Sequence, residues 1–157
     1  MADLNVTAAS VAALTAPTGN QIATVTARGI AGATISPGQV VYADPSANNL
    51  LKAAQANSQL QAANIVGIAL GSASVNQPLT YAISGDVMVP TTGTNTTLTS
   101  GSVYVLSAGT AGNMIATGDA GTPTAGNFAS AIGIGNGTVT GTTSTFRLNL
   151  MPAAVRL

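Results

Sequence analysis

The 157-residue sequence contains no cysteine, no histidine and no tryptophan, and only 5% of its residues are charged. Without cysteine and histidine there is no disulfide framework, no thiol nucleophile, no imidazole base and no common type of zinc site. A chain of about 150 residues buries roughly 68–70% of the surface that it exposes when unfolded, so one domain is expected to fold without such crosslinks.

Charge is scarce and balanced. The four basic residues are Arg28, Lys52, Arg147 and Arg156, and the four acidic residues are Asp3, Asp44, Asp86 and Asp119, so the formal net charge is zero. Nucleic-acid binding depends on clustered Lys and Arg that neutralise phosphates, and we therefore predict no nucleic-acid partner. A net charge of magnitude about 2–8 usually helps a small domain to resist association. A neutral chain suggests a protein that works inside an assembly.

The positions of the aspartates do not predict catalysis or metal binding. Asp44, Asp86 and Asp119 each lie next to Pro or Gly, in contexts where Asp usually hydrogen-bonds its own backbone in a turn. Glycoside hydrolysis needs two converging carboxylates, and calcium binding needs several oxygen ligands at regular spacing. No ten-residue segment holds two aspartates. We predict no catalytic residue, no cofactor site and no metal site.

The sequence offers only a weak match to a nucleotide-binding loop, and it shows no pattern of a membrane helix or a secretion signal. The glycines at 133, 135 and 137 lack the spacing of a dinucleotide-binding loop and the lysine of a phosphate-binding loop, so we interpret them as a Gly-rich hairpin. No stretch approaches the ~20 apolar residues of a membrane helix, and the first residues lack the pattern of a secretion signal. We expect a soluble protein that is made in the cytoplasm and has no membrane partner.

What the sequence does contain is a series of short runs rich in Val, Ile, Leu and Tyr. Gly, Pro, Asn and Ser interrupt these runs about every 8–12 residues, which is typical of all-β barrels and sandwiches. We predict a single compact all-β domain, either a β-barrel or a β-sandwich. The expected strands cover residues 21–27, 39–42, 50–53, 65–70, 79–83, 87–89, 103–106, 114–117, 131–135 and 145–150.

Two triplets of apolar residues alternate with other residues, as in half-buried strands, and should form much of the core. They are Leu79, Tyr81 and Ile83, and Phe146, Leu148 and Leu150. Residues 57–64 are the exception to the strand pattern. There Asn57 is expected to cap a single helical turn, the alternative being a longer helix from Ser46.

An internal repeat organises most of the chain. Residues 36–42 match 99–105 at an offset of 63, 49–51 match 113–115 at 64, 66–68 match 132–134 at 66, and 81–83 match 146–148 at 65. Open solenoids need three or more repeats. We therefore interpret residues 35–90 and 98–152 as two halves of one closed domain with an internal two-fold repeat, within a β domain that spans residues 21–157.

Glycines mark equivalent points in the two halves. Pro37 and Gly38 predict a type II turn before the first strand of one half, and the other half keeps the glycine as Gly101. Gly67 and Gly133 lie inside apolar runs, where glycine usually marks a β-bulge or a close approach of two backbones. We expect both to set the curvature of a barrel.

Residues 1–20 lie outside the repeat and are expected to form an extended N-terminal arm. Residues 5–14 are uncharged and rich in Ala, Val and Thr. They fit either an edge strand or an arm that docks on a neighbouring protein. In the second case Leu4, Val6, Val11 and Leu14 would supply the apolar contact, together with residues 153–157.

The strand-and-turn patterns in residues 32–42, 66–70, 77–81, 84–87 and 101–107 resemble those of small tailed-phage capsid decoration proteins, the cement or head-fibre-like family. This resemblance covers about residues 30–150. It implies a β-rich virion protein, a homotrimer, that lies on the outer surface of a bacteriophage capsid and bridges neighbouring copies of the major capsid protein. It implies no catalytic residues and no cofactor.

A receptor- or glycan-binding module of a phage tail or fibre is the alternative, because such modules are also β-rich, neutral and oligomeric. Exposed aromatic side chains over a polar groove would favour it. The five aromatic residues, Tyr42, Tyr81, Tyr104, Phe128 and Phe146, fall mostly on expected core strands.

Overall fold

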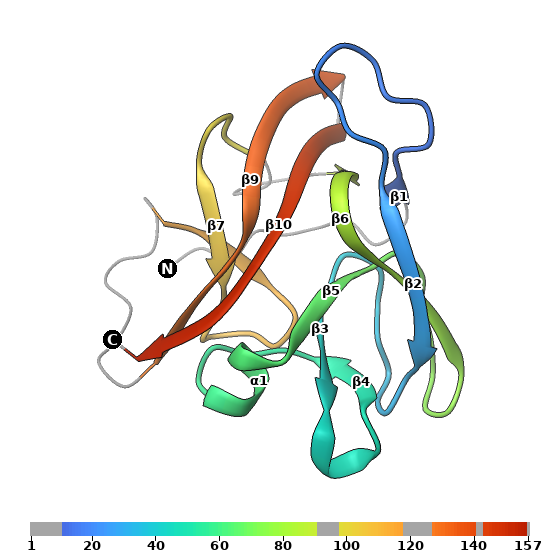
Figure 1. Cartoon of the computed structure of the whole chain (residues 1–157), viewed down its shortest axis with the longest axis vertical. Coiled ribbons are helices and arrows are strands. Elements are labelled where there is room, and N and C mark those ends of the chain that lie inside the picture. The colour runs from blue at the N-terminus through green and yellow to red at the C-terminus, as the bar shows by residue number, and fades with distance from the viewer. Residues whose placement is uncertain (1–10, 91–97, 118–126, 141–142, 157) are drawn as a thin grey trace.

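A computed structural model describes residues 11–90, 98–117, 127–140 and 143–156, and within these ranges most of the chain is β-strand (Figure 1). All strand pairs are antiparallel, so the predicted all-β fold is confirmed. The strands are β1 (Ala12–Ala13), β2 (Val25–Ile30), β3 (Val40–Asp44), β4 (Leu50–Ala53), β5 (Ile65–Ala69), β6 (Pro78–Pro90), β7 (Val103–Leu106), β8 (Met114–Ala116), β9 (Phe128–Thr140) and β10 (Thr143–Arg156). A short 3-10 helix η2 (Pro45–Ala47) and the helix α1 (Gln59–Ala63) complete the described elements.

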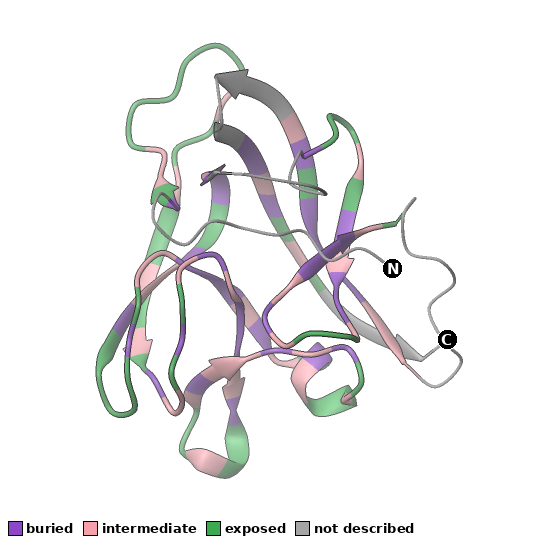
Figure 2. Cartoon of the chain, turned by 180° about the vertical axis from the view of Figure 1, so that it is seen from behind, coloured by how far each residue is buried: buried purple, intermediate pink, exposed green. Residues whose placement is uncertain are grey.

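The strands form one sheet in the order β4-β3-β5-β6-β10-β9-β7-β8, and β1 and β2 both pair with β6. The sheet curls into a half-barrel, and many of the residues on its strands are buried (Figure 2). The first four strands of this order belong to the first half of the chain and the last four to the second half. The two halves therefore join where β6 pairs with β10.

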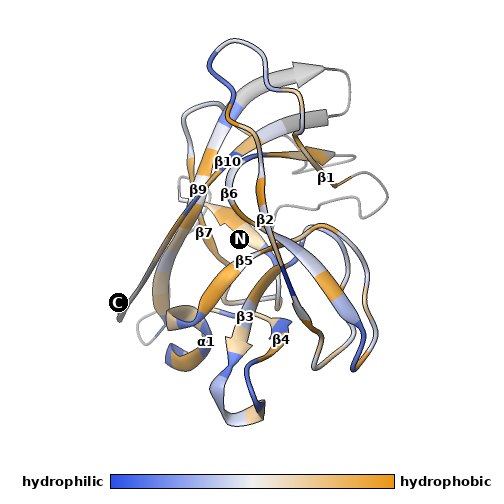
Figure 3. Cartoon of the chain, turned by 45° about the vertical axis from the view of Figure 1, so that its right-hand side comes forward, coloured by the Kyte–Doolittle hydropathy of each residue, from blue (hydrophilic) through white to orange (hydrophobic). Residues whose placement is uncertain are grey.

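Buried apolar residues form two clusters. The larger one fills the curled side and includes Val40, Ile68, Tyr104 and Phe146. The smaller one lies around Leu79, with Ile35, Val41, Leu51 and Ala73 among its members. Figure 3 shows the apolar strand β5 in the middle of the molecule and the polar turn between β3 and β4 at its lower end.

The expected strands all have counterparts, with some differences in extent. The boundaries 50–53 and 103–106 match β4 and β7, whereas the segment expected at 21–27 forms β2 at Val25–Ile30. The segments at 79–83 and 87–89 belong to one strand, β6. Gly85 adopts a φ of +87° within β6, so it bends the strand without ending it.

The core triplets are only partly correct. Leu79, Phe146 and Leu148 are buried, but Ile83 is 37% exposed. Val25 of β2 pairs with Ser84 and Thr26 pairs with Ala82, so Ile83 is the extra residue of a β-bulge and turns outward. Tyr81 and Leu150 are half-buried.

One local prediction is confirmed and another needs correction. Gly133 and Gly135 lie in the long strand β9, which pairs antiparallel with the next strand β10, so they belong to a Gly-rich hairpin as predicted. The helical turn at 57–64 exists as α1, but Ser58 occupies the N-cap position and not Asn57. The Ser58 N–H donates to Gln55 O, which places Asn57 in the exposed turn before the helix.

Strand pairing in the two halves follows the same registers. Val40 pairs with Ile68 between β3 and β5, and Val103 pairs with Ile134 between β7 and β9. Val40 and Val103 are 63 positions apart, and Ile68 and Ile134 are 66 positions apart. The turn before each strand also agrees with the prediction, because Gly38 and Gly101 have φ values of +87° and +79°.

The registers of the β3–β4 and β7–β8 hairpins correct the offset of one matched segment in the predicted repeat. Ala43 pairs with Leu51 between β3 and β4, and Leu106 pairs with Met114 between β7 and β8. Leu51 therefore corresponds to Met114 at an offset of 63, and the offset of 64 assigned to residues 49–51 is one residue too long. A one-residue error of this kind moves a side chain to the other face of a sheet.

Gly67 and Gly133 occupy the predicted close approaches. A Cβ on Gly67 would lie 2.0 Å from the Ala82 carbonyl oxygen, and a Cβ on Gly133 would lie 2.2 Å from the Arg147 carbonyl oxygen. Each glycine also borders a register shift, between β3 and β5 for Gly67 and between β7 and β9 for Gly133. In both halves, therefore, a glycine at a close backbone approach lies where the sheet bends.

Substitution of these glycines is expected to destabilise the fold. Gly67→Ala and Gly133→Ala should each lower the free energy of unfolding by about 2–3 kcal/mol, because the clashing atoms belong to backbone that cannot rotate away. Gly71→Ala is the control, since a Cβ on Gly71 meets nothing within 4 Å. Urea denaturation of the three variants measures the difference, and equal midpoints for Gly67→Ala and Gly71→Ala would contradict the assignment.

Candidate functional site

The described part of the predicted arm lies against the β domain. Val11 is buried in the larger apolar cluster, and Ala12 and Ala13 of β1 pair with Met88 and Val87 of β6. These contacts fit the edge-strand alternative for residues 11–13. Leu14 is half-buried. The other two predicted contact residues, Leu4 and Val6, lie outside the described residues.

Residues 14–24 form a loop that returns to the sheet, and we name it the strap. Its two ends are joined, because Thr24 N–H donates to Leu14 O (3.0 Å) and Leu14 N–H donates to the Thr24 hydroxyl oxygen (2.6 Å). The Thr24 hydroxyl in turn donates to the Asp86 carbonyl oxygen. Within the strap, Gln21 accepts from the Thr18 N–H and hydroxyl.

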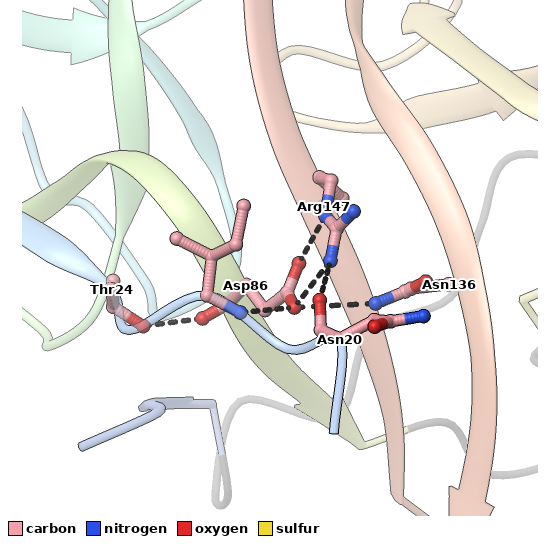
Figure 4. A network of polar contacts seen from close by, with 6 residues as sticks. Asn20, Thr24, Asp86, Asn136 and Arg147 are labelled. Carbon is pink, nitrogen blue, oxygen red and sulfur yellow. Dashed lines mark hydrogen bonds and ion pairs between the residues drawn. The ribbon is translucent and has the colours of Figure 1, made fainter. Parts of the chain in front are cut away.

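The centre of this region is Asp86, which lies within β6 (Figure 4). Its side chain is fully buried, although it is a carboxylate. Its Oδ1 accepts from Arg147 Nε at 2.9 Å, and its Oδ2 accepts from Arg147 Nη2 at 3.1 Å. This two-point contact is the strong form of an arginine–carboxylate pair. Oδ2 also accepts from the Ile22 N–H at 2.9 Å and from Asn136 Nδ2 at 3.2 Å.

The network connects four parts of the chain. Asp86 comes from β6, Arg147 from β10 and Asn136 from β9, while Ile22 belongs to the strap. Arg147 Nη2 also donates to the Asn20 carbonyl oxygen of the strap at 2.6 Å. One buried carboxylate therefore fastens the strap to the strands that join the two halves.

Burial of Asp86 acts to raise its pKa, but the hydrogen bonds from Arg147, Ile22 and Asn136 and the charge of Arg147 outweigh it and lower the pKa. The carboxylate is therefore ionised at neutral pH. The sequence prediction that Asp86 serves a turn is wrong, because Gly85 lets the strand continue past it. A Cβ on Gly85 would lie 2.2 Å from the strap carbonyl of Ala23.

Asp44 fulfils the sequence prediction for turn aspartates. Its carboxylate accepts from the Ser46 N–H (2.9 Å) and hydroxyl (2.6 Å) and caps η2. Lys52 Nζ of β4 lies 2.8 Å from Asp44 Oδ2. Hydrogen bonds from Lys52 and Ser46 lower the pKa of Asp44 to about 2. The remaining aspartates, Asp3 and Asp119, lie outside the described residues.

The charged side chains are mostly paired with one another. Of the five that the structure describes, four form the two ion pairs Asp44–Lys52 and Asp86–Arg147, and Arg28 is the fifth. The described part of the surface therefore presents little unpaired charge to a partner.

Large apolar side chains are exposed on and around β2. Five of the nine in the described residues lie in the segment before β2, in β2 itself, or in β6 and the turn before it. They are Ile22, Val25, Ile30, Val75 and Ile83, and we name them the β2 surface. Val25 and Ile83 are 49% and 37% exposed. The sequence signal for this surface was weak, because alternation placed Ile83 in the core.

Within the described residues, no group of three or more potential metal ligands comes together, and no helix is long and apolar enough to cross a membrane. No protein-family model matches the chain, and no curated protein sequence is similar to it.

Loss of the Asp86–Arg147 pair should free the strap and weaken the fold. Arg147→Gln is expected to lower the free energy of unfolding by about 2–3 kcal/mol. This is less than the 3–5 kcal/mol typical of a fully buried pair, because about a third of the Arg147 side chain remains exposed. Arg28→Gln removes the same charge from an exposed site and should have little effect in the same urea titration.

Acid should remove the contribution of the Asp86–Arg147 pair to the free energy of unfolding. The pKa of Asp86 is lowered in the folded state, so the pair stabilises the fold fully above the unfolded-state value of about 3.9 and is lost as the pH falls below it. The difference in unfolding free energy between the wild type and Asp86→Asn should stay constant from pH 7 to about 5 and shrink below pH 4. A difference that grows on acidification would disprove the assignment.

Proposed function

We propose that this protein decorates the outer surface of a tailed-phage capsid and stabilises the shell by bridging copies of the major capsid protein. A protein that binds only the assembled lattice stabilises that lattice by mass action, and no reactive group is required. The resemblance in residues 30–150 points to this role. The localisation would be the virion, and we propose a homotrimer as the active form.

The observation that carries the proposal is the internal pairing of charge beside exposed apolar side chains. Asp44, Lys52, Asp86 and Arg147 are already paired, so they offer little electrostatic attraction to a partner. The β2 surface offers apolar area next to the strap. The buried core of a protein interface is depleted of charged residues and is more apolar than the rest of the protein surface.

The alternative role, receptor or glycan binding, finds less support. Tyr42, Tyr104 and Phe146 are buried, and Tyr81 and Phe128 are half-buried. Tyr104 and Phe146 pack edge to face with their ring centroids 5.7 Å apart. These rings are therefore engaged in packing and do not form an exposed aromatic platform.

Binding to the shell should be nearly independent of salt. Purified protein is mixed with expanded empty capsids of the phage that carries this gene, and the sedimenting fraction is measured between about 0.1 M and 1 M salt. Over this range the Debye length falls from about 10 Å to 3 Å, so charge-driven binding would weaken steeply. Absence of a sedimenting complex, or a change of orders of magnitude with salt, would reject the proposal.

The contact surface is tested by placing a charge on it. Val25→Asp and Ile83→Asp should each reduce capsid binding at least tenfold, because the new carboxylate must lose its water in an apolar contact. Leu60→Asp is the matched control, since Leu60 is 45% exposed on α1, which lies outside the β2 surface. Equal loss of binding for all three variants would show that the β2 surface is not the contact.

A further inference from the structure

One asparagine in the sequence directly precedes a glycine. The chain has twelve asparagines, and only Asn136 is followed by glycine, at residue 137. In such a pair the backbone nitrogen of the glycine can attack the side-chain amide carbon of the asparagine, because glycine has no Cβ to shield that nitrogen. Ammonia leaves, and water then opens the cyclic imide. Asn136 is therefore the asparagine whose sequence context most favours spontaneous loss of the side-chain amide.

The pairing of β9 with β10 is irregular at this asparagine. Gly135 pairs with Phe146, and Val139 pairs with Ser144. Residues 136–138 of β9 therefore lie opposite Thr145 alone, as in a β-bulge. A regular ladder keeps a strand extended, whereas the extra residues of a bulge are left out of the pairing and bend the strand. The bulge thus weakens the constraint that a regular strand would place on ring closure.

The side chain of Asn136 belongs to the network that holds the strap (Figure 4). Its Nδ2 donates to Asp86 Oδ2 at 3.2 Å, and the same oxygen accepts from the Ile22 N–H of the strap at 2.9 Å. Asn136 is only half-buried, so water can reach it. Loss of the amide would replace the Nδ2 donor with a carboxylate oxygen that faces Asp86 Oδ2.

The product would place a second carboxylate in a site that holds one cation. Arg147 already makes a two-point contact with Asp86, at 2.9 and 3.1 Å. Two carboxylates within hydrogen-bond distance repel each other, and this repulsion is strong where one of them is buried away from water. Asp86 is fully buried. The hydrogen bond from Ile22 to Asp86 is therefore expected to weaken when residue 136 becomes an acid.

We propose that Asn136 is a site of spontaneous deamidation and that its product releases the strap from Asp86. The Gly137 nitrogen forms a bond to Asn136 Cγ and gives up its proton, while the Cγ–Nδ2 bond breaks and Nδ2 leaves with a proton as ammonia. One water molecule then opens the imide, at Cγ to give aspartate or at the backbone carbonyl to give isoaspartate. The reaction consumes only water and needs no capsid, so it is tested apart from the proposed function.

Incubation of the folded protein at physiological temperature in mildly alkaline buffer tests the reaction. The formal net charge is zero, so one new carboxylate makes the chain an anion that anion-exchange chromatography separates. Digestion with a protease that cuts before aspartate, followed by mass spectrometry, should locate the change at residue 136. The rate should lie within about tenfold of that of a synthetic peptide of residues 133–139, an added barrier of at most about 1.4 kcal/mol.

Asn136→Gln keeps an amide but requires a larger ring that closes less readily, so this variant should not accumulate the anion. Asn57→Gln is the matched control, because Asn57 lies in an exposed turn and precedes serine. It should form the anion at the rate of the wild type. A wild type that stays neutral while the peptide converts would overturn the proposal, and so would an anion that Asn136→Gln still forms.

Asn136→Asp reproduces the aspartate product and tests the release of the strap. Asn136→Ser is the matched control, since it also removes the amide donor but adds no charge. At neutral pH the Ile22 N–H should exchange its hydrogen at least about tenfold faster in Asn136→Asp than in Asn136→Ser, while exchange in β5 stays alike. The difference should vanish below about pH 4, where carboxylates take up protons. Equal exchange at Ile22, or an equal gain in β5, would reject the release of the strap.

Discussion

The pairing of β6 with β10 is the contact on which the rest of the structure depends. Each half of the chain contributes a four-stranded unit, and the two units share a sheet because these two strands pair. Asp86 and Arg147 face each other in this pairing and place a buried ion pair at the join. A buried carboxylate without its partner is strongly unfavourable, so the join, the strap and the ion pair stabilise one another. The strap is thereby positioned beside the β2 surface, where we propose that the shell binds.

The two halves use the same strand registers but bury different faces. Val40 and Val103 hold equivalent places in their strands, and so do Val41 and Tyr104. Val40 faces the interior shared by both halves, whereas in the second half it is Tyr104 that is buried there and Val103 that is partly exposed. The two halves therefore turn opposite faces of equivalent strands toward the shared interior.

Local patterns in the sequence predicted most of the strands and the positions of the bending glycines. Gly67 and Gly133 were recognisable because glycine inside an apolar run usually marks a bulge or a close backbone approach. Ile83 and Asp86 could not be placed in this way. The outward turn of Ile83 depends on a β-bulge opposite β2, and the burial of Asp86 depends on Arg147, which is 61 residues away in the chain. Such pairings over long distances leave no periodic signal in a single sequence.

Few unpaired charges on the surface make it less costly to cover that surface in an interface. An exposed charge is well solvated in water, and covering it in an interface costs that solvation unless a partner supplies the opposite charge. By pairing Asp44 with Lys52 and Asp86 with Arg147, the chain uses four of its few charges to hold its own turns and strap. Apart from the exposed Arg28, the described surface that remains carries hydroxyl, amide and apolar groups, which can be covered at little electrostatic cost. This arrangement suits the contact with a shell that we propose, because that contact can form from backbone and apolar groups alone.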